Sequence, residues 1–244
     1  MPVIIGIAIV IVVLIIAVIV FVSPMLSMHP LESGKIEGTD IIAIKNRIND
    51  LFFIPAGEDW IVVDAGSDVD SIKQEMEQLS IDGDKVKGVF LTHTDCDHVA
   101  FLVLFPNAAI YLSEQEKQMI DGSTYRQLLK KNKLPKLRDS NKIVGLRDGE
   151  MVELCKLKVR MLLAPGHTKG SAMYAIDEKY LFTGDAFRVK DGRILVHPYT
   201  MDKAQAQKTI EGIKGELGKY ERVFTAHYGC IFNSHNKTVS QFPN

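Results

Sequence analysis

The feature that most constrains this chain is an unbroken apolar stretch at residues 3–22, which contains only Ile, Val, Leu, Ala, Gly and Phe. About 20 helical residues at about 1.5 Å each span about 30 Å, the thickness of the hydrocarbon core of a bilayer. In lipid, only a helix can satisfy the backbone of such an isolated segment. No Lys or Arg precedes the stretch, and it is longer than the core of a signal peptide, which favours an uncleaved anchor over a cleaved signal.

We therefore expect a transmembrane anchor over residues 1–23, a tether over residues 24–35 and a folded domain over residues 36–244. The first basic residue after the anchor is Lys35, so the positive-inside rule does not decide which side of the membrane carries the domain. Three scattered cysteines favour a reducing compartment over a disulfide framework. We therefore expect a single-pass membrane protein, and a cytoplasmic position of the folded domain is slightly favoured.

The part after the anchor has the length of one domain, and its patterning indicates a mixed α/β layered fold. The formal net charge of −1 argues against binding through bulk electrostatics, so no nucleic acid partner is expected. Short β-type runs alternate with Gly-containing turns. Strands are expected at 41–46, 51–57, 60–66, 86–93, 108–112, 142–146, 157–163, 172–176, 179–184 and 222–227, and helices at 69–80 and 202–218.

A basic segment breaks the otherwise even charge distribution. Residues 124–138 contain six cations and no acidic residue, namely Arg126, Lys130, Lys131, Lys133, Lys136 and Arg138. Such a run is usually a solvated surface. The alternatives are a cationic rim over a site for anionic substrates, or a contact with anionic lipid headgroups.

The segment HTDCDH at residues 93–98 places four candidate metal ligands directly after an apolar strand. Alternate residues of an extended segment share one side, so His93, Asp95 and Asp97 can converge, and His98 joins them from the following turn. Carboxylates this close repel one another unless a cation lies among them. A polar loop that caps a helix near Asp97 would explain one Asp but neither histidine.

Three further candidates lie at the ends of expected strands: His167, Asp185 and His227. Each is weak alone, but side chains at strand ends can meet at one edge of a sheet. The other histidines are interpreted as part of the tether (His29), a candidate support for the ligands (His197) and a surface residue (His235).

Together, the segments HTDCDH (93–98), PGHTKGS (165–171), FTGDA (182–186) and AHYG (226–229) resemble the metallo-β-lactamase superfamily in order, spacing and context. The resemblance covers residues 36 to about 240 and is closest to the glyoxalase II-like and lactonase-like branch. It implies a four-layer αββα sandwich with a metal site at one edge of the sheets.

The resemblance also implies a role for each candidate ligand. His93, Asp95 and His167 would hold a first divalent ion, and Asp97, His98 and His227 a second. Asp185 would bridge the two, and Asp97 and Asp185 are the expected catalytic residues. The family signature is H-x-H-x-D-H, so Asp95 stands where the second His is usual. Zinc is the expected metal, but this harder ligand makes iron or manganese an alternative.

The expected function is hydrolysis of an ester, thioester or lactone carbonyl by a metal-activated hydroxide. The substrate would be a small molecule, anionic if the basic segment faces the site. Thr92, Thr168 and Tyr228 neighbour the ligands and are expected to orient the imidazoles, whereas Cys96 is expected to be a buried, inert thiol. Two alternatives stay open: a metal-dependent phosphodiesterase or nuclease, and a membrane protein that binds metal without catalysis.

Overall fold

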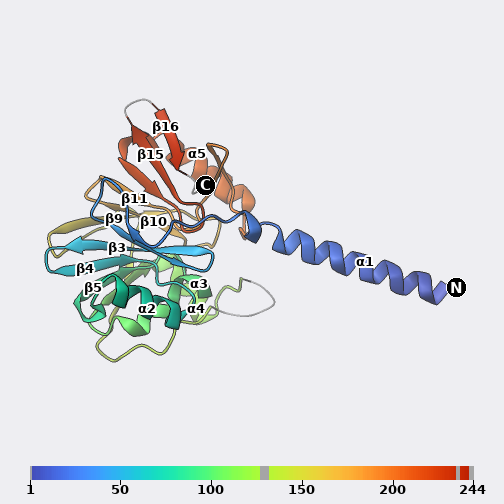
Figure 1. Ribbon diagram of the computed structural model, residues 1–244, viewed down its shortest axis with the longest axis horizontal. Helices are drawn as coiled ribbons and strands as arrows, with labels where there is room; N and C mark the ends of the chain where they lie inside the picture. The colour runs from blue at the N-terminus through green and yellow to red at the C-terminus, as the bar shows by residue number, and fades with distance from the viewer. Residues whose placement is uncertain (1, 127–131, 235–236, 242–244) are drawn as a thin grey trace.

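The computed structural model describes residues 2–126, 132–234 and 237–241. Two seven-stranded sheets pack against each other, and helices cover their outer faces (Figure 1). The expected four-layer arrangement is therefore confirmed.

The first sheet is built from the amino-terminal half of the domain. Its strands follow one another in chain order: β1 (Gly34–Lys35), β2 (Ile42–Asn46), β3 (Asn49–Ala56), β4 (Asp59–Val63), β5 (Val86–Phe90), β6 (Ala109–Ser113) and β7 (Ile143–Leu146). The strands from β1 to β4 pair antiparallel, whereas β4 to β7 are parallel. The carboxyl ends of β4, β5 and β6 therefore share one edge of the sheet.

The second sheet has the order β16 (Lys237–Gln241), β15 (Cys230–Ser234), β14 (Arg222–Phe224), β11 (Tyr180–Phe182), β10 (Ala172–Ile176), β9 (Leu157–Leu163) and β8 (Met151–Leu154). Its one parallel pair is β11 with β14. The loops that follow these two strands therefore leave the sheet at the same edge. A separate ribbon is formed by β12 (Arg188–Lys190) and β13 (Arg193–Leu195).

The main hydrophobic core lies between the sheets. Phe52 of the first sheet packs on Phe182 of the second, with ring centroids 5.1 Å apart. The longer helices of the domain are α2 (Val69–Gln78), which packs on the first sheet, and α5 (Lys203–Lys214), which packs on the second. Short helices complete the loops: α3 (Cys96–Val99), α4 (Lys117–Asp121), η1 (Met25–Ser27), η2 (Gly83–Lys85), η3 (Ala100–Leu104), η4 (Glu114–Glu116) and η5 (Leu217–Lys219).

The last expected strand, 222–227, is wrong in its extent. β14 ends at Phe224 because Thr225 turns the chain: its N–H and hydroxyl both donate to the carbonyl of Gly229, at 3.0 Å each. Six further strands were not expected from the sequence: β1, β8, β12, β13, β15 and β16. The helix expected at 202–218 ends at Lys214, and η5 follows as a separate turn.

The apolar amino-terminal stretch forms α1 (Pro2–Val22), which projects away from the sheets (Figure 1). Its described side chains are exposed, for example Leu14 at 60% and Val20 at 66%. Among the described residues it is the one helix long and apolar enough to cross a membrane, with a mean hydropathy of 3.7. A signal sequence has the same properties.

Candidate metal centre

The HTDCDH loop is held in place by a residue from the neighbouring strand. Asp64 directly follows β4 in a left-handed conformation, with φ of 60°. Its carboxylate accepts hydrogen bonds from the Thr92 N–H, at 2.8 Å, and from the Thr92 hydroxyl. The same carboxylate lies 2.9 Å from Nδ1 of His98, in α3. The end of β4 therefore fixes both ends of the loop after β5.

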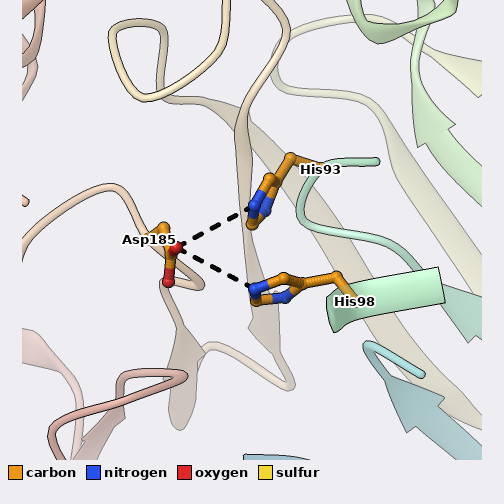
Figure 2. A group of neighbouring side chains, drawn as sticks. All are labelled: His93, His98 and Asp185. Carbon is orange, nitrogen blue, oxygen red and sulfur yellow. Dashed lines mark ion pairs between the residues drawn. The ribbon is translucent and has the colours of Figure 1, made fainter. Parts of the chain in front are cut away.

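Asp185 lies at the centre of the site, in the loop after β11. Figure 2 shows its carboxylate facing His93 and His98, whose Nε2 atoms both lie 3.9 Å from Oδ2. Nε2 of His167 is 3.3 Å from Oδ2, and Nε2 of His227 is 3.2 Å from Oδ1. Four imidazoles from three loops thus surround one buried carboxylate.

The seven residues singled out in the sequence meet at this place. Two groups have ligand atoms that all lie within 4.8 Å of one another: His93, Asp95 and His167, and Asp97, His98 and His227. Nε2 of His93 and Nε2 of His98 are buried without a hydrogen-bond partner among the described residues. Buried, unpaired nitrogen atoms beside carboxylates are the donor set that zinc and other divalent transition metals prefer. The residues therefore fit one or two divalent cations.

The protonation states of three candidate ligands, Asp95, His167 and Asp185, favour metal binding. Although burial raises it, the pKa of Asp185 lies well below its ordinary value because His197, His227 and His167 surround it. Asp95 likewise has a lowered pKa, since His93 and His167 offset its burial. Burial lowers the pKa of His167 to about 4. At neutral pH the carboxylates are ionised and this imidazole is neutral, which are the protonation states that metal ligands require.

Most of the ligand histidines are oriented by partners on the side away from the cluster. Nδ1 of His227 lies 2.6 Å from the carbonyl of Ile48, and Nδ1 of His93 lies 3.1 Å from the hydroxyl of Thr92. Such contacts select the tautomer that presents Nε2 to a metal. Of the three residues expected in this role, Thr92 takes it. Thr168 and Tyr228 make no hydrogen bond to an imidazole among the described residues.

Thr168 instead contributes to a buried junction around Glu116. The Glu116 carboxylate accepts hydrogen bonds from the Thr94 N–H (2.8 Å), the Thr94 hydroxyl (2.7 Å) and the Thr168 hydroxyl (2.6 Å). Burial raises the pKa of Glu116. This glutamate ties the HTDCDH loop to the PGHTKGS loop and so sets the spacing between Asp95 and His167.

Arg126 reaches into the centre from the basic segment. Its Nε lies 2.8 Å from Oδ2 of Asp95, and its Nη2 lies 3.1 Å from Nε2 of His167. It also donates to the carbonyls of His167 (2.9 Å) and Tyr199 (2.7 Å). The solvated-surface interpretation is therefore wrong for Arg126. It holds for the exposed Lys133, Lys136 and Arg138, whereas Lys130 and Lys131 lie outside the described residues.

His197 belongs to the cluster more closely than the sequence indicated. It is buried in the loop after β13, with Nε2 3.7 Å from Oδ2 of Asp185, and it forms a further possible ligand group with His167 and Asp185. Its sequence signal was a lone His-Pro pair outside the four motif segments. Cys96 is exposed rather than buried, and burial of part of its side chain raises its pKa. His235 lies outside the described residues.

Comparison with known proteins agrees with this geometry. The model of the metallo-beta-lactamase superfamily matches residues 47–227. A probable polyketide biosynthesis zinc-dependent hydrolase, BaeB of Bacillus velezensis, is 26% identical over 170 residues, which is 68% of this chain and 66% of that protein. A hydroxyacylglutathione hydrolase of Glaesserella parasuis is 33% identical over 145 residues, which is 57% of this chain and 50% of that protein. The chain thus spans about half to two thirds of the length of these relatives.

Solved structures show the same fold. A B3 metallo-beta-lactamase described as having an active-site glutamic acid aligns with a TM-score of 0.62 and 16% identity, over 82% of this chain and 80% of that chain. An archaeal superfamily protein from Sulfolobus tokodaii aligns with a TM-score of 0.55 and 20% identity, over 79% of this chain and 81% of that chain. With its matching family model, paired sheets and clustered histidines and aspartates, this chain belongs to the metallo-β-lactamase superfamily.

Proposed function

We propose that this protein is a membrane-anchored, binuclear metal-dependent hydrolase that acts on an ester, thioester or lactone. The observation that carries the proposal is the position of Asp185, within 3.9 Å of the Nε2 atoms of four buried histidines. The names of the relatives, a zinc-dependent hydrolase and hydroxyacylglutathione hydrolases, support the reaction class.

In this proposal each of the two ligand groups would hold one divalent ion. His93, Asp95 and His167 would hold the first, Asp97, His98 and His227 would hold the second, and Asp185 would serve both. Divalent ions supply a bound water with a pKa of about 7 and polarise the carbonyl oxygen of a substrate. Zinc suits the imidazoles, and Asp95 gives iron or manganese a larger share than an all-histidine site would.

The two catalytic aspartates have different surroundings. Asp185 is buried and ionised, so it can accept a hydrogen bond from the attacking water and orient it at the centre of the site. The side chain of Asp97 is 28% exposed and faces His98 and His227, each at 3.7 Å. It is therefore the more accessible of the two aspartates, and it lies against two imidazoles of the cluster.

Residues 1–23 form the anchor, residues 24–35 the tether and residues 36–244 the catalytic domain in this proposal. The exposed apolar surface of α1 supports anchoring, because a soluble protein rarely leaves so large an apolar surface in water. Alkaline carbonate extraction of membranes that contain the full chain tests it. The chain should stay in the membrane pellet at its full mass, whereas release or a cleaved amino terminus would overturn anchoring.

Metal content and turnover of the full chain in detergent test the reaction. We expect about two metal ions per chain and hydrolysis of at least one member of an ester, thioester and lactone panel. Asp185→Asn should lower kcat at least about a hundredfold, whereas the exposed Asp84→Asn should not change it. Full activity of the Asp185 variant would contradict the proposal. A nitrophenyl phosphodiester in the same panel tests the phosphodiesterase alternative.

Asp95→His separates the hydrolase from a protein that only binds metal. If Asp95 binds metal in an active enzyme, the substitution should shift the metal preference towards zinc. The activity of the variant should stay within about tenfold of the parent's. Activity that appears only in the histidine variant would indicate a natural protein without catalysis.

A further inference from the structure

A cavity lies beside the metal centre, between the tether and the β12–β13 ribbon. Its volume is about 210 Å³. Its polar lining consists of Ser27 and His29 from the tether, Arg188, Lys190 and Asp191 from the ribbon, and Tyr228 from the loop after β14. None of these six residues is among the candidate metal ligands.

The cavity and the metal centre share a wall. Tyr228 directly follows His227, and its ring centroid lies 5.8 Å from that of the cluster residue His197. On the tether side, the N–H of His29 donates to the carbonyl of His227 at 2.7 Å. A molecule that fills the cavity would therefore contact Tyr228, whose ring packs near His197 of the cluster.

The lining offers hydrogen-bond donors to an anion. Arg188 Nε is buried without a hydrogen-bond partner among the described residues, and the side chains of Ser27 and Arg188 both face the Tyr228 hydroxyl. Leaving a buried guanidinium N–H unpaired costs free energy that a ligand would recover. A guanidinium and a hydroxyl together match the oxygens of a phosphate or carboxylate.

The net charge of the cavity lining is positive, which also favours an anion. Arg188 and the exposed Lys190 carry two positive charges, and Asp191 is the one carboxylate among the lining residues of the cavity. Asp191 is exposed at the turn of the ribbon. The half-buried Arg188 therefore places a positive charge in the inner part of the cavity. The exposed Lys190 and Asp191 place charges of both signs at its outer part.

The tether places this cavity close to the end of α1. Ser27 follows Val22, the last residue of α1, by five positions, and the intervening segment includes the compact turn of η1. Five residues extend at most about 18 Å. The headgroup layer adds about 5–8 Å on each side of the hydrocarbon core. With α1 in a bilayer, the cavity lies within reach of the headgroups.

We propose that this cavity binds the anionic headgroup of a membrane lipid and that such a lipid is the substrate class of the adjacent centre. The inference rests on the proposed hydrolase function. In the reaction, the oxygen of water bonds to the acyl carbon, the ester C–O bond breaks, and the departing alkoxide takes a proton from the water. The products are a carboxylic acid and the alcohol that carries the headgroup.

Binding is tested with the full chain in phosphatidylcholine nanodiscs by isothermal titration calorimetry. The probes are a short-chain diether phosphatidic acid, which lacks the ester bond that the proposed reaction breaks, and inorganic phosphate. We expect Arg188→Gln to weaken the Kd for the short-chain lipid at least tenfold. Arg193→Gln is the matched control, because Arg193 is exposed in the same ribbon, opposite Lys190, and does not line the cavity. Its Kd should stay within twofold of the parent.

A second variant protects the test against misfolding. Tyr228→Phe removes only the hydroxyl. It should raise the Kd for the short-chain lipid severalfold and leave the circular dichroism spectrum unchanged. Equal weakening by Arg188→Gln and Arg193→Gln, or no binding of the lipid by the parent, would overturn the proposal. Inorganic phosphate that binds as tightly as the lipid would also overturn it, because the cavity would then be a site for a soluble anion.

The binding measurement does not depend on turnover, so the two proposals can fail separately. Arg188-dependent lipid binding by a chain that hydrolyses no ester, thioester or lactone would support the cavity and overturn the hydrolase. Hydrolysis of a soluble thioester by a chain that binds no anionic lipid would support the hydrolase and overturn the cavity.

Discussion

Arg126 places a fixed positive charge where the first of the two proposed metal ions would lie. Its guanidinium lies 2.8 Å from Asp95 Oδ2 and 3.1 Å from His167 Nε2, which are the atoms that this ion would contact. A cation and a guanidinium cannot share the same lone pairs. Metal binding at this group therefore has to displace Arg126, and the energy of its four polar contacts opposes that displacement.

We expect Arg126→Gln to tighten metal binding at the weaker of the two sites by about tenfold, which corresponds to about 1.4 kcal/mol. Calorimetric titration of the metal-free full chain with zinc measures both sites. Arg138→Gln is the control, because it removes the same charge from an exposed position of the same segment. Equal tightening in both variants would indicate a general effect of charge instead of competition.

The residues that sequence reasoning missed are isolated in the sequence. The seven proposed ligands lie in short segments whose composition is unusual, so they could be read one by one. Asp64 lies 28 residues before Thr92 and Glu116 lies 22 residues after Thr94, and neither has a distinctive neighbour. Arg126 looked like one cation in a basic run. Contacts of this kind depend on how strands align, which composition does not encode.

At the scale of elements, the turn after β11 determines where Asp185 lies. Gly184 has φ of 50°, and a Cβ on it would lie 2.3 Å from Thr92 Oγ1, the hydroxyl that Asp64 holds. The loops after β4, β5 and β11 therefore meet at a point with no room for a side chain. This close contact fixes Asp185 relative to His93.

Gly184→Ala should lower the free energy of unfolding by about 2–4 kcal/mol, through backbone strain and overlap with Thr92. Gly192→Ala is the matched control, because its φ is 70° but a Cβ there meets nothing within 4 Å. It should cost about 1 kcal/mol, from strain alone. Equal losses in denaturant titrations would show that the contact with Thr92 contributes nothing.

Most strands of the sheet interiors could be predicted, whereas most edge strands could not. The run Ala172–Ile176, for example, is continuous and apolar because both of its faces are covered. The ribbon strands β12 and β13 have three residues each and carry charged side chains, so they have no such signal. The cavity beside this ribbon depends on them, and for that reason it was not foreseen.

At the scale of the whole molecule, Asp50 joins the tether to the domain, and its contribution to the free energy of unfolding depends on pH. Its carboxylate is buried in β3 and accepts a hydrogen bond from the Leu31 N–H at 2.9 Å. Burial raises the pKa of Asp50 well above its ordinary value. Between the unfolded and folded pKa values the native state binds more protons, so the contribution of Asp50 to stability falls as pH rises through this window.

Asp50→Asn keeps an acceptor for Leu31 and removes this titration. The stability of the parent relative to the variant should therefore fall between pH 4 and pH 7.5 in denaturant titrations. Asp40→Asn is a control of opposite sign, because hydrogen bonding to Lys35 lowers the pKa of Asp40. A parent-to-variant difference that is constant with pH would contradict the assignment for Asp50.

The docked tether connects the orientation of α1, the proposed anchor, to that of the candidate metal centre. Met28 is buried, and the N–H groups of His29 and Leu31 bond to the domain, so the junction with α1 is held within a few residues of the site. A ten-residue Gly-Ser linker inserted between Val22 and Ser23 leaves all of these contacts intact. Such a linker has an end-to-end distance of about 16–19 Å, enough to release the cavity from the headgroup layer.

We expect the linker variant to have the same thermal stability as the parent and to hydrolyse a soluble thioester at the same rate. Its turnover of an anionic ester lipid in vesicles should fall severalfold, because the chain no longer holds the site at the surface. The same linker inserted after Gly57, at an open turn between β3 and β4, is the control and should leave both activities unchanged. Lipid turnover that survives insertion beside α1 would mean that the tether supplies stability alone, and that substrates reach the centre from solution.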